Sequence, residues 1–301
     1  MQNRISVGVD QTGAVARGGA AWRPLPTAIA VEGDSGLVHL FASERTAASF
    51  RPLSLASFSR TEVLGSLARV AVEPSRNARI RVLVDCVLGL PSVMTSQNRK
   101  PLPLRAALLQ AVEYFASLER EGMPSRGRGP AEEFFARILR ESGQSGIPTR
   151  LCERLAGANS VFKSRPYQKN VQTGTYRIWV ELGQELLANR SFIFPHHEAD
   201  RPLDLGQPKL LIEESWPSLL WKTLLGAKAR EPARLDELLR ELSERIQKKL
   251  VCSHRDLEIC ATHPDQADAL VLALGGLLLP QWDGEIPIAQ EGWITGLALP
   301  E

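Results

Sequence analysis

The sequence has few cysteines and no apolar run long enough to cross a membrane. Its four cysteines form no CxxC pair, which argues against a zinc cage. The longest strongly apolar stretch, residues 269–280, is too short to span a bilayer. The first residues lack the cationic segment and apolar run of a secretory signal. We therefore expect a cytoplasmic protein with reduced thiols and no membrane partner.

A marked excess of charge of either sign is also absent. The chain has 36 Lys and Arg against 34 Asp and Glu, a formal net charge of +2. A site for a polyanion must therefore be a local patch rather than the whole surface. The 301 residues are enough for one large domain with a sizeable core.

The two ends of the chain show the pattern of a sheet covered by helices. Strands are predicted at residues 4–9, 79–91 and 209–215, a hairpin at 27–43, helices at 60–72, 233–250 and 262–279, and a short extended piece at 292–299. The strand at 79–91 is continuously apolar, which is typical of a central strand covered on both faces.

The middle of the chain interrupts this pattern. Residues 104–120 and 130–142 predict amphipathic helices, and residues 148–187 predict short helical pieces around a polar loop. We interpret residues 100–190 as a helical insertion or cap within a single domain that spans 1–301.

Acidic residues stand at several places where burial makes a charge expensive. Asp10 ends the first strand and Asp85 lies inside the apolar strand at 79–91. Alternation along 209–215 puts Glu213 and Glu214 on opposite faces, so only one of them points into a site. The alternatives are a turn-forming Asp10, a buried Asp85 with local hydrogen bonds, and a solvent-exposed glutamate.

Two further acids, Asp265 and Asp268, lie three residues apart at the start of the helix at 262–279 and share a face. Thr262 and Asp265 also fit a capping box, so Asp265 has a purely structural alternative. Asp268 precedes a stretch that is apolar on nearly all sides, which predicts its burial.

Taken together, these carboxylates indicate a metal site. Gathered carboxylates repel one another, and divalent cations relieve that repulsion. Mg²⁺ favours a few carboxylates together with water and phosphate oxygens, and two ions about 4 Å apart promote phosphodiester cleavage. Such a site needs no catalytic Cys, Ser or His.

Four motifs occur in this order: VGVDQTG, VLVDCVLGLP, EESWP and HPDQADALVLALGG. They resemble an uncharacterised family of predicted nucleases with an RNase H-like fold, known as domain of unknown function 429. The last motif is also similar to the terminal helix of RuvC-type Holliday-junction resolvases. The resemblance covers residues 4–91 and 209–299. It implies an α/β fold with a mixed central sheet flanked by helices.

The resemblance also implies a metal-dependent nuclease with two Mg²⁺ or Mn²⁺ ions. The implied catalytic ligands are Asp10, Asp85, Glu214 and Asp268, with Asp265 as an extra or alternative ligand. Glu214 is preferred to Glu213 because the family pattern reads acid, two residues, proline. Related sequences often carry an acid directly after that proline, where this chain has Ser218.

Two other functions compete with nuclease activity. A binding or scaffold subunit would keep the acids without catalysing cleavage. An actin-like phosphotransferase would use Asp10 in a phosphate-binding turn. A kinase of this type needs further glycine-rich turns that bind phosphate through backbone N–H groups. The segment DCVLGLP has too few glycines to form such a turn.

A nucleic-acid partner, DNA or RNA, is predicted to lie on a local basic patch. Residues 160–180 contain four cations and no acid, interleaved with aromatic residues that include Tyr176 and Trp179. Phosphate contacts are assigned to Lys163, Arg165, Lys169, Arg126 and Arg128. The alternative is a solvated basic loop. His196 and His197 read as a surface loop, and His263 is a weak candidate for proton transfer.

Overall fold

A computed structural model describes most of the chain. The described residues are 4–11, 14–16, 19–46, 49–76, 78–94, 102–163, 171–188, 192–193, 208–280 and 291–297.

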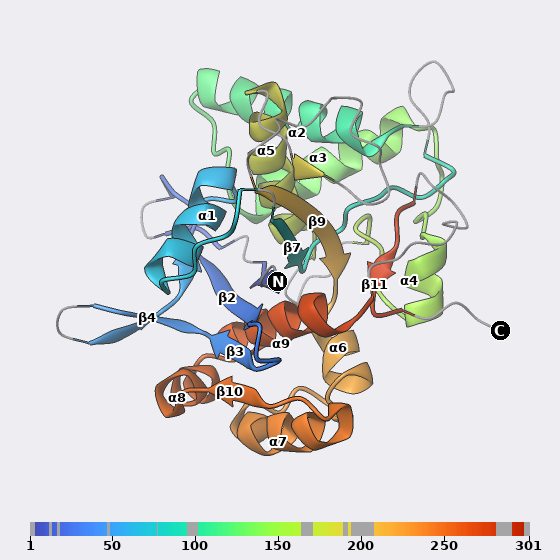
Figure 1. The fold of residues 1–301 in the computed structure, drawn as a ribbon. Helices are drawn as coiled ribbons and strands as arrows, with labels where there is room; N and C mark the ends of the chain where they lie inside the picture. Colours follow the sequence, from blue (N-terminus) through green and yellow to red (C-terminus); the bar gives the residue numbers. More distant parts are fainter. Residues whose placement is uncertain are drawn as a thin grey trace.

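The core of the fold is a mixed β-sheet with strand order β10-β3-β2-β1-β7-β9-β11 (Figure 1). In chain order these strands are β1 (Arg4–Val9), β2 (Leu25–Glu32), β3 (Val38–Phe41), β7 (Arg79–Val84), β9 (Lys209–Ser215), β10 (Leu250–Cys252) and β11 (Ile294–Thr295). Strands β1, β2 and β3 are antiparallel neighbours, whereas β7 runs parallel to both β1 and β9. The α/β class and the mixed sheet predicted from the sequence are confirmed.

Two further short strands pair with β2 and β9, and another two form a separate two-stranded sheet. The pairs are β6 (Ser54–Leu55) with β2, β8 (Phe192–Ile193) with β9, and β4 (Ser43–Arg45) with β5 (Phe50–Pro52). The hairpin predicted at 27–43 is confirmed as the antiparallel pair β2 and β3.

Helices cover both faces of the sheet (Figure 1). One face carries α1 (Arg60–Arg69), α2 (Leu104–Arg120), α3 (Arg128–Glu141) and α5 (Val171–Leu187). The other face carries α6 (Pro217–Thr223), α7 (Leu235–Ile246), α8 (His254–Thr262) and α9 (Pro264–Leu278). The short helices α4 (Leu151–Ala156) and η1 (Pro232–Arg234) complete the set within the described residues.

The middle helices form part of the main hydrophobic core. Phe134 on α3 and Trp179 on α5 are buried in one cluster with Val7 and Val82 of the sheet. The helices predicted at 104–120 and 130–142 are confirmed as α2 and α3. The prediction of short helical pieces within 148–187 is wrong in part. The second half of this range forms α5, one continuous helix of 17 residues.

Helix α9 lies directly on β1 because glycines at positions 8 and 276 leave room for the close approach. A β-carbon on Gly8 would fall 2.0 Å from the carbonyl oxygen of Ala269, and one on Gly276 would fall 2.1 Å from Ser6 Oγ. Side chains alternate along β1, so Ser6 and Gly8 face α9 while Val7 and Val9 face the opposite cluster. The first turn of α9 is therefore held against the end of β1.

The predicted capping box at the start of α9 is wrong. Thr262 belongs to α8, where its hydroxyl donates to the carbonyl oxygens of Glu258 and Ile259 at 2.9 and 3.1 Å. His263 is the N-cap of α9, and its side chain makes no capping hydrogen bond. The carboxylate of Asp265 instead accepts a hydrogen bond from Arg230, outside its own helix, at 3.0 Å.

Candidate metal-binding site

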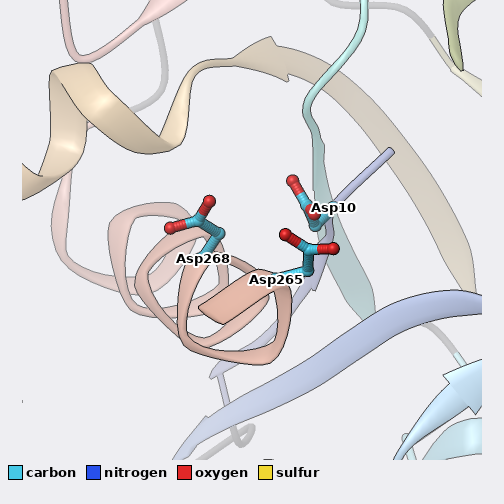
Figure 2. Close-up of side chains that lie close together, drawn as sticks. All are labelled: Asp10, Asp265 and Asp268. Carbon is cyan, nitrogen blue, oxygen red and sulfur yellow. The ribbon is translucent and has the colours of Figure 1, made fainter. Parts of the chain in front are cut away.

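Three carboxylates meet where β1 ends and α9 begins (Figure 2). One oxygen each from Asp10, Asp265 and Asp268 lies within 4.8 Å of the other two. Asp10 and Asp268 are buried, with 4% and 6% of their surfaces exposed, while Asp265 is partly exposed. A set of three carboxylate oxygens is a suitable donor set for a hard divalent cation, so these residues could hold a metal ion.

The local chain path explains why these side chains converge. Asp10 directly follows β1, continues the alternation of Ser6 and Gly8, and donates its backbone N–H to Pro26 O at 3.0 Å. Asp265 and Asp268 are three residues apart in the first turns of α9 and share one helix face. The close packing of α9 on β1 then brings that face to Asp10.

Asp268 is held by two side chains from the segment that follows β9. The indole N–H of Trp221 on α6 donates to Asp268 Oδ1 at 2.8 Å, and Arg230 lies 2.6 Å from Asp268 Oδ2. Burial raises the pKa of Asp268 to about 6, and repulsion from Asp265 adds to the rise, although the contacts with Trp221 and Arg230 oppose it. The carboxylate is thus ionised at neutral pH at an energetic cost that a bound cation would reduce.

Arg230 bridges two of the three acids. Its Nη2 lies 3.0 Å from Asp265 Oδ1 as well as 2.6 Å from Asp268 Oδ2. Burial alone would lower the pKa of Arg230, but the negative charges of Asp268, Asp265 and Asp10 raise it. A guanidinium therefore neutralises part of the carboxylate charge in this structure.

Asp85 lies beside Asp10, just after the neighbouring strand rather than inside it as the sequence predicted, because β7 ends at Val84. Its backbone N–H donates to Val9 O at 3.0 Å, and it directly follows β7, so both acids stand at the carboxyl end of the parallel pair β1 and β7. Its side chain is partly exposed and is not one of the three that gather within 4.8 Å. The metal-ligand role of Asp85 stays a prediction.

The two glutamates of β9 point to opposite faces, as the alternation predicts. Glu213 pairs with Leu83 and accepts from Arg81 Nε at 2.6 Å, and Arg81 also donates to Gly276 O of α9. Glu213 therefore lies on the α9 side of the sheet and is neutralised by Arg81.

Glu214 lies on the opposite side and is bound by a buried arginine. Arg150, which is 0% exposed, donates to both carboxylate oxygens of Glu214, with Nη1 at 2.6 Å from Oε2. The backbone N–H of Leu88 adds a hydrogen bond of 2.8 Å, and Arg150 also contacts Glu153 at 2.9 Å. Arg150 thus holds both oxygens of Glu214 in this structure, and the metal-ligand role of Glu214 stays a prediction.

Of the five residues assigned to phosphate contacts, the structure describes Arg126, Arg128 and Lys163. Arg126 pairs with Glu119 at 2.7 Å and its guanidinium lies over the Phe115 ring, whereas Arg128 pairs with Glu132 at 2.8 Å on α3. Lys163 is exposed, and Arg165 and Lys169 lie outside the described residues. The phosphate-binding role of these five residues stays a prediction.

The proposed stacking of nucleic-acid bases on two aromatic residues of this segment is wrong. Tyr176 and Trp179 are both 0% exposed and pack in the core against Phe134. Arg177, counted among the free cations of the segment, is buried and pairs with Glu181 at 3.1 Å. Helix α5 is buried on nearly all sides, so these side chains lie in the core.

The comparisons with known proteins identify no relative. No family model, curated protein or solved structure matches this chain. Within the described part of the chain, no helix combines the length and apolarity of a membrane span. A functional conclusion must therefore rest on the geometry of the site rather than on similarity to known proteins.

Two functional neighbours of the carboxylates were not found from the sequence, namely Trp221 and Arg230. Both follow the EESWP motif, on α6 and on the segment after it, and α6 packs against α9 in one apolar cluster. The motif contained a usable signal, because Pro217 at the first position of α6 directs the chain back over α9. His263 is exposed at the N-cap of α9, and His196 and His197 lie outside the described residues.

Proposed function

We propose that this protein is a divalent-metal-dependent nuclease that hydrolyses phosphodiester bonds of DNA or RNA. The observation that carries the proposal is the convergence of Asp10, Asp265 and Asp268 within 4.8 Å. The mixed sheet, with three parallel strands β1, β7 and β9, supports the RNase H-like fold that the sequence motifs imply. The site lies at the carboxyl ends of β1 and β7, which is the usual place for ligands in open α/β sheets.

The side chains present fit Mg²⁺ or Mn²⁺. All three gathered donors are carboxylates, without the thiolates or imidazoles that favour zinc or copper. Their combined charge exceeds that of the guanidinium of Arg230, so the site remains anionic. Asp10 and Asp268 are also buried, which makes their negative charge costly to hold.

The metal chemistry of this site would consist of lowering the pKa of a bound water and stabilising the charge that develops on the phosphate. The protein would contribute the positions of the ligands. Asp10 is fixed by its backbone hydrogen bond to Pro26, and Asp268 is oriented by the indole N–H of Trp221. Asp85, which directly follows β7 beside Asp10, is the candidate additional ligand for a second ion.

A cleavage assay tests the proposal. The full chain is incubated with single-stranded, duplex and junction DNA and with RNA, in Mg²⁺, in Mn²⁺ and in EDTA. We expect metal-dependent cleavage that Asp10→Asn abolishes and that Asp236→Asn preserves, because Asp236 is an exposed residue of α7. Absence of cleavage by the native protein with either metal would overturn the proposal and favour a non-catalytic binding subunit.

A further inference from the structure

Arg230 is the residue near the carboxylates that the proposed chemistry leaves unexplained. Its Nη2 contacts Asp265 at 3.0 Å and Asp268 at 2.6 Å, while 35% of its side chain is exposed. It lies between α6 and η1, in a segment that includes Gly226 at φ +72°. The guanidinium is therefore anchored to the site by ion pairs and retains access to solvent.

The position of Arg230 conflicts with simultaneous metal binding by the same oxygens. A divalent ion and the guanidinium would both be attracted to the carboxylates of Asp265 and Asp268. Two cations in contact with the same carboxylates repel each other. In this structure Arg230 supplies the positive charge that a metal ion would otherwise supply. A metal ion bound at these same oxygens would therefore weaken or replace the contacts of Arg230.

We propose, on the basis of the metal site described above, that Arg230 is an exchangeable counter-ion that becomes the phosphate-binding residue of this site. A divalent ion takes its place on Asp265 and Asp268, and the released guanidinium binds a phosphodiester of the nucleic acid. The protein's affinity for the nucleic acid is then coupled to its affinity for the metal.

The chemistry of arginine suits this exchange. Its guanidinium stays charged at any pH at which the protein is folded, so release from the carboxylates leaves a full positive charge. Its planar donors match the oxygens of a phosphate as well as those of a carboxylate, often in a bidentate manner. The partial exposure of Arg230 means that it need not cross the core to reach a bound polyanion.

Neutral substitutions of Arg230 test the proposal in two binding assays on the full chain. Arg230→Gln and Arg230→Met remove the competing cation, so we expect Mn²⁺ to bind about tenfold more tightly in calorimetric titration. A short fluorescent oligonucleotide, single-stranded or duplex, is expected to bind about tenfold more weakly to these variants in Ca²⁺, which tests binding without relying on cleavage.

Arg234→Gln is the matched control. Arg234 is an exposed arginine of η1 that pairs with Glu231 and Glu237 and does not contact the three aspartates. We expect this variant to bind both Mn²⁺ and the oligonucleotide with native affinity. Thermal melting of each variant establishes that it is folded before the affinities are compared.

The outcomes separate this proposal from the proposed function. If the native protein binds Mn²⁺ and Asp10→Asn does not, but Arg230→Gln and Arg230→Met bind Mn²⁺ with native or weaker affinity, the counter-ion proposal is overturned and the metal site stands. Oligonucleotide affinity that is unchanged in both variants likewise overturns the phosphate-binding role. Failure of the native protein to bind Mn²⁺ overturns both proposals.

Discussion

Gly8 on β1 lies directly against Ala269 on α9, so closely that a β-carbon on Gly8 would fall 2.0 Å from the carbonyl oxygen of Ala269. This contact is between backbone atoms of two elements that are far apart in the sequence. It sets the distance between the end of β1 and the first turn of α9, and therefore the distance from Asp10 to Asp265 and Asp268.

Substitution of Gly8 is expected to disturb the fold and the site together. Gly8→Ala forces α9 away from β1, because the nearest atoms are backbone atoms that cannot rotate aside. Overpacking of this kind costs about 1–3 kcal/mol. Urea unfolding should show that loss, and Mn²⁺ titration should show weaker binding. Gly33→Ala is the control, since a β-carbon there meets nothing within 4 Å; equal stability of the two variants would contradict the packing argument.

The Trp221 side chain is expected to tune the affinity of the site for metal. Trp221→Phe keeps the apolar packing of α6 but removes the hydrogen bond that the indole N–H donates to Asp268 Oδ1. Loss of that donor raises the pKa of Asp268 further above about 6 and destabilises the ionised form. We expect Mn²⁺ affinity at pH 7 to fall about tenfold, as for a hydrogen bond to a charged group.

Trp293→Phe is the matched control for this comparison. Its indole donates to Leu297 O at 3.0 Å and it lies in a different apolar cluster. Native Mn²⁺ affinity in Trp221→Phe, or an equal loss in Trp293→Phe, would show that the indole donor does not act on Asp268.

The stability of the metal-free protein should depend on pH through Asp268. Its folded pKa is raised from 3.8 to about 6, so the folded protein binds this proton more tightly than the unfolded chain. Stability from this group is therefore present at low pH and is lost as pH rises through about 6. A rise of about two pKa units corresponds to roughly 3 kcal/mol.

The variant Asp268→Asn measures this effect. In EDTA above pH 7, the variant should be more stable to urea than the native protein by up to roughly 3 kcal/mol, and the difference should shrink towards pH 4.5. The same variant should lose Mn²⁺ binding, which is the usual cost of stabilising a functional site. A difference in stability that stays constant between pH 4.5 and 8 would contradict the assignment.

The buried pair of Arg150 and Glu214 is expected to be a strong structural element. Glu214→Gln leaves the fully buried guanidinium of Arg150 without its main counter-ion, which costs about 3–5 kcal/mol for a pair of this kind. Glu237→Gln breaks an exposed pair with Arg234 and should leave the free energy of unfolding nearly unchanged. Comparable unfolding free energies for the two variants would contradict the structural role of Glu214.

The position of the acidic site could be predicted from the sequence because it depends on local patterns. Asp10 follows an apolar strand, and Asp265 and Asp268 are spaced to share a helix face. Both patterns are readable without knowledge of the fold. The prediction that these three side chains converge rested on a further inference, namely that buried carboxylates need a shared cation. The structure does bring the three side chains together.

Interactions between distant segments could not be predicted in this way. No local pattern pairs Arg150 with Glu214 or Arg230 with Asp268, because each pair is formed by packing of elements far apart in the chain. The interpretation of Tyr176 and Trp179 failed for a related reason. The charge of the segment did not indicate that α5 is buried on nearly all sides, so that even Arg177 lies in the core beside the two rings.

A crystal structure of the protein soaked in Mn²⁺, with anomalous data collected, tests the central claim most directly. The account predicts an anomalous peak bonded to carboxylate oxygens of Asp10 and Asp268, with the Arg230 side chain displaced from Asp268. An anomalous map without a peak at these residues, at Mn²⁺ concentrations that support cleavage, would contradict it.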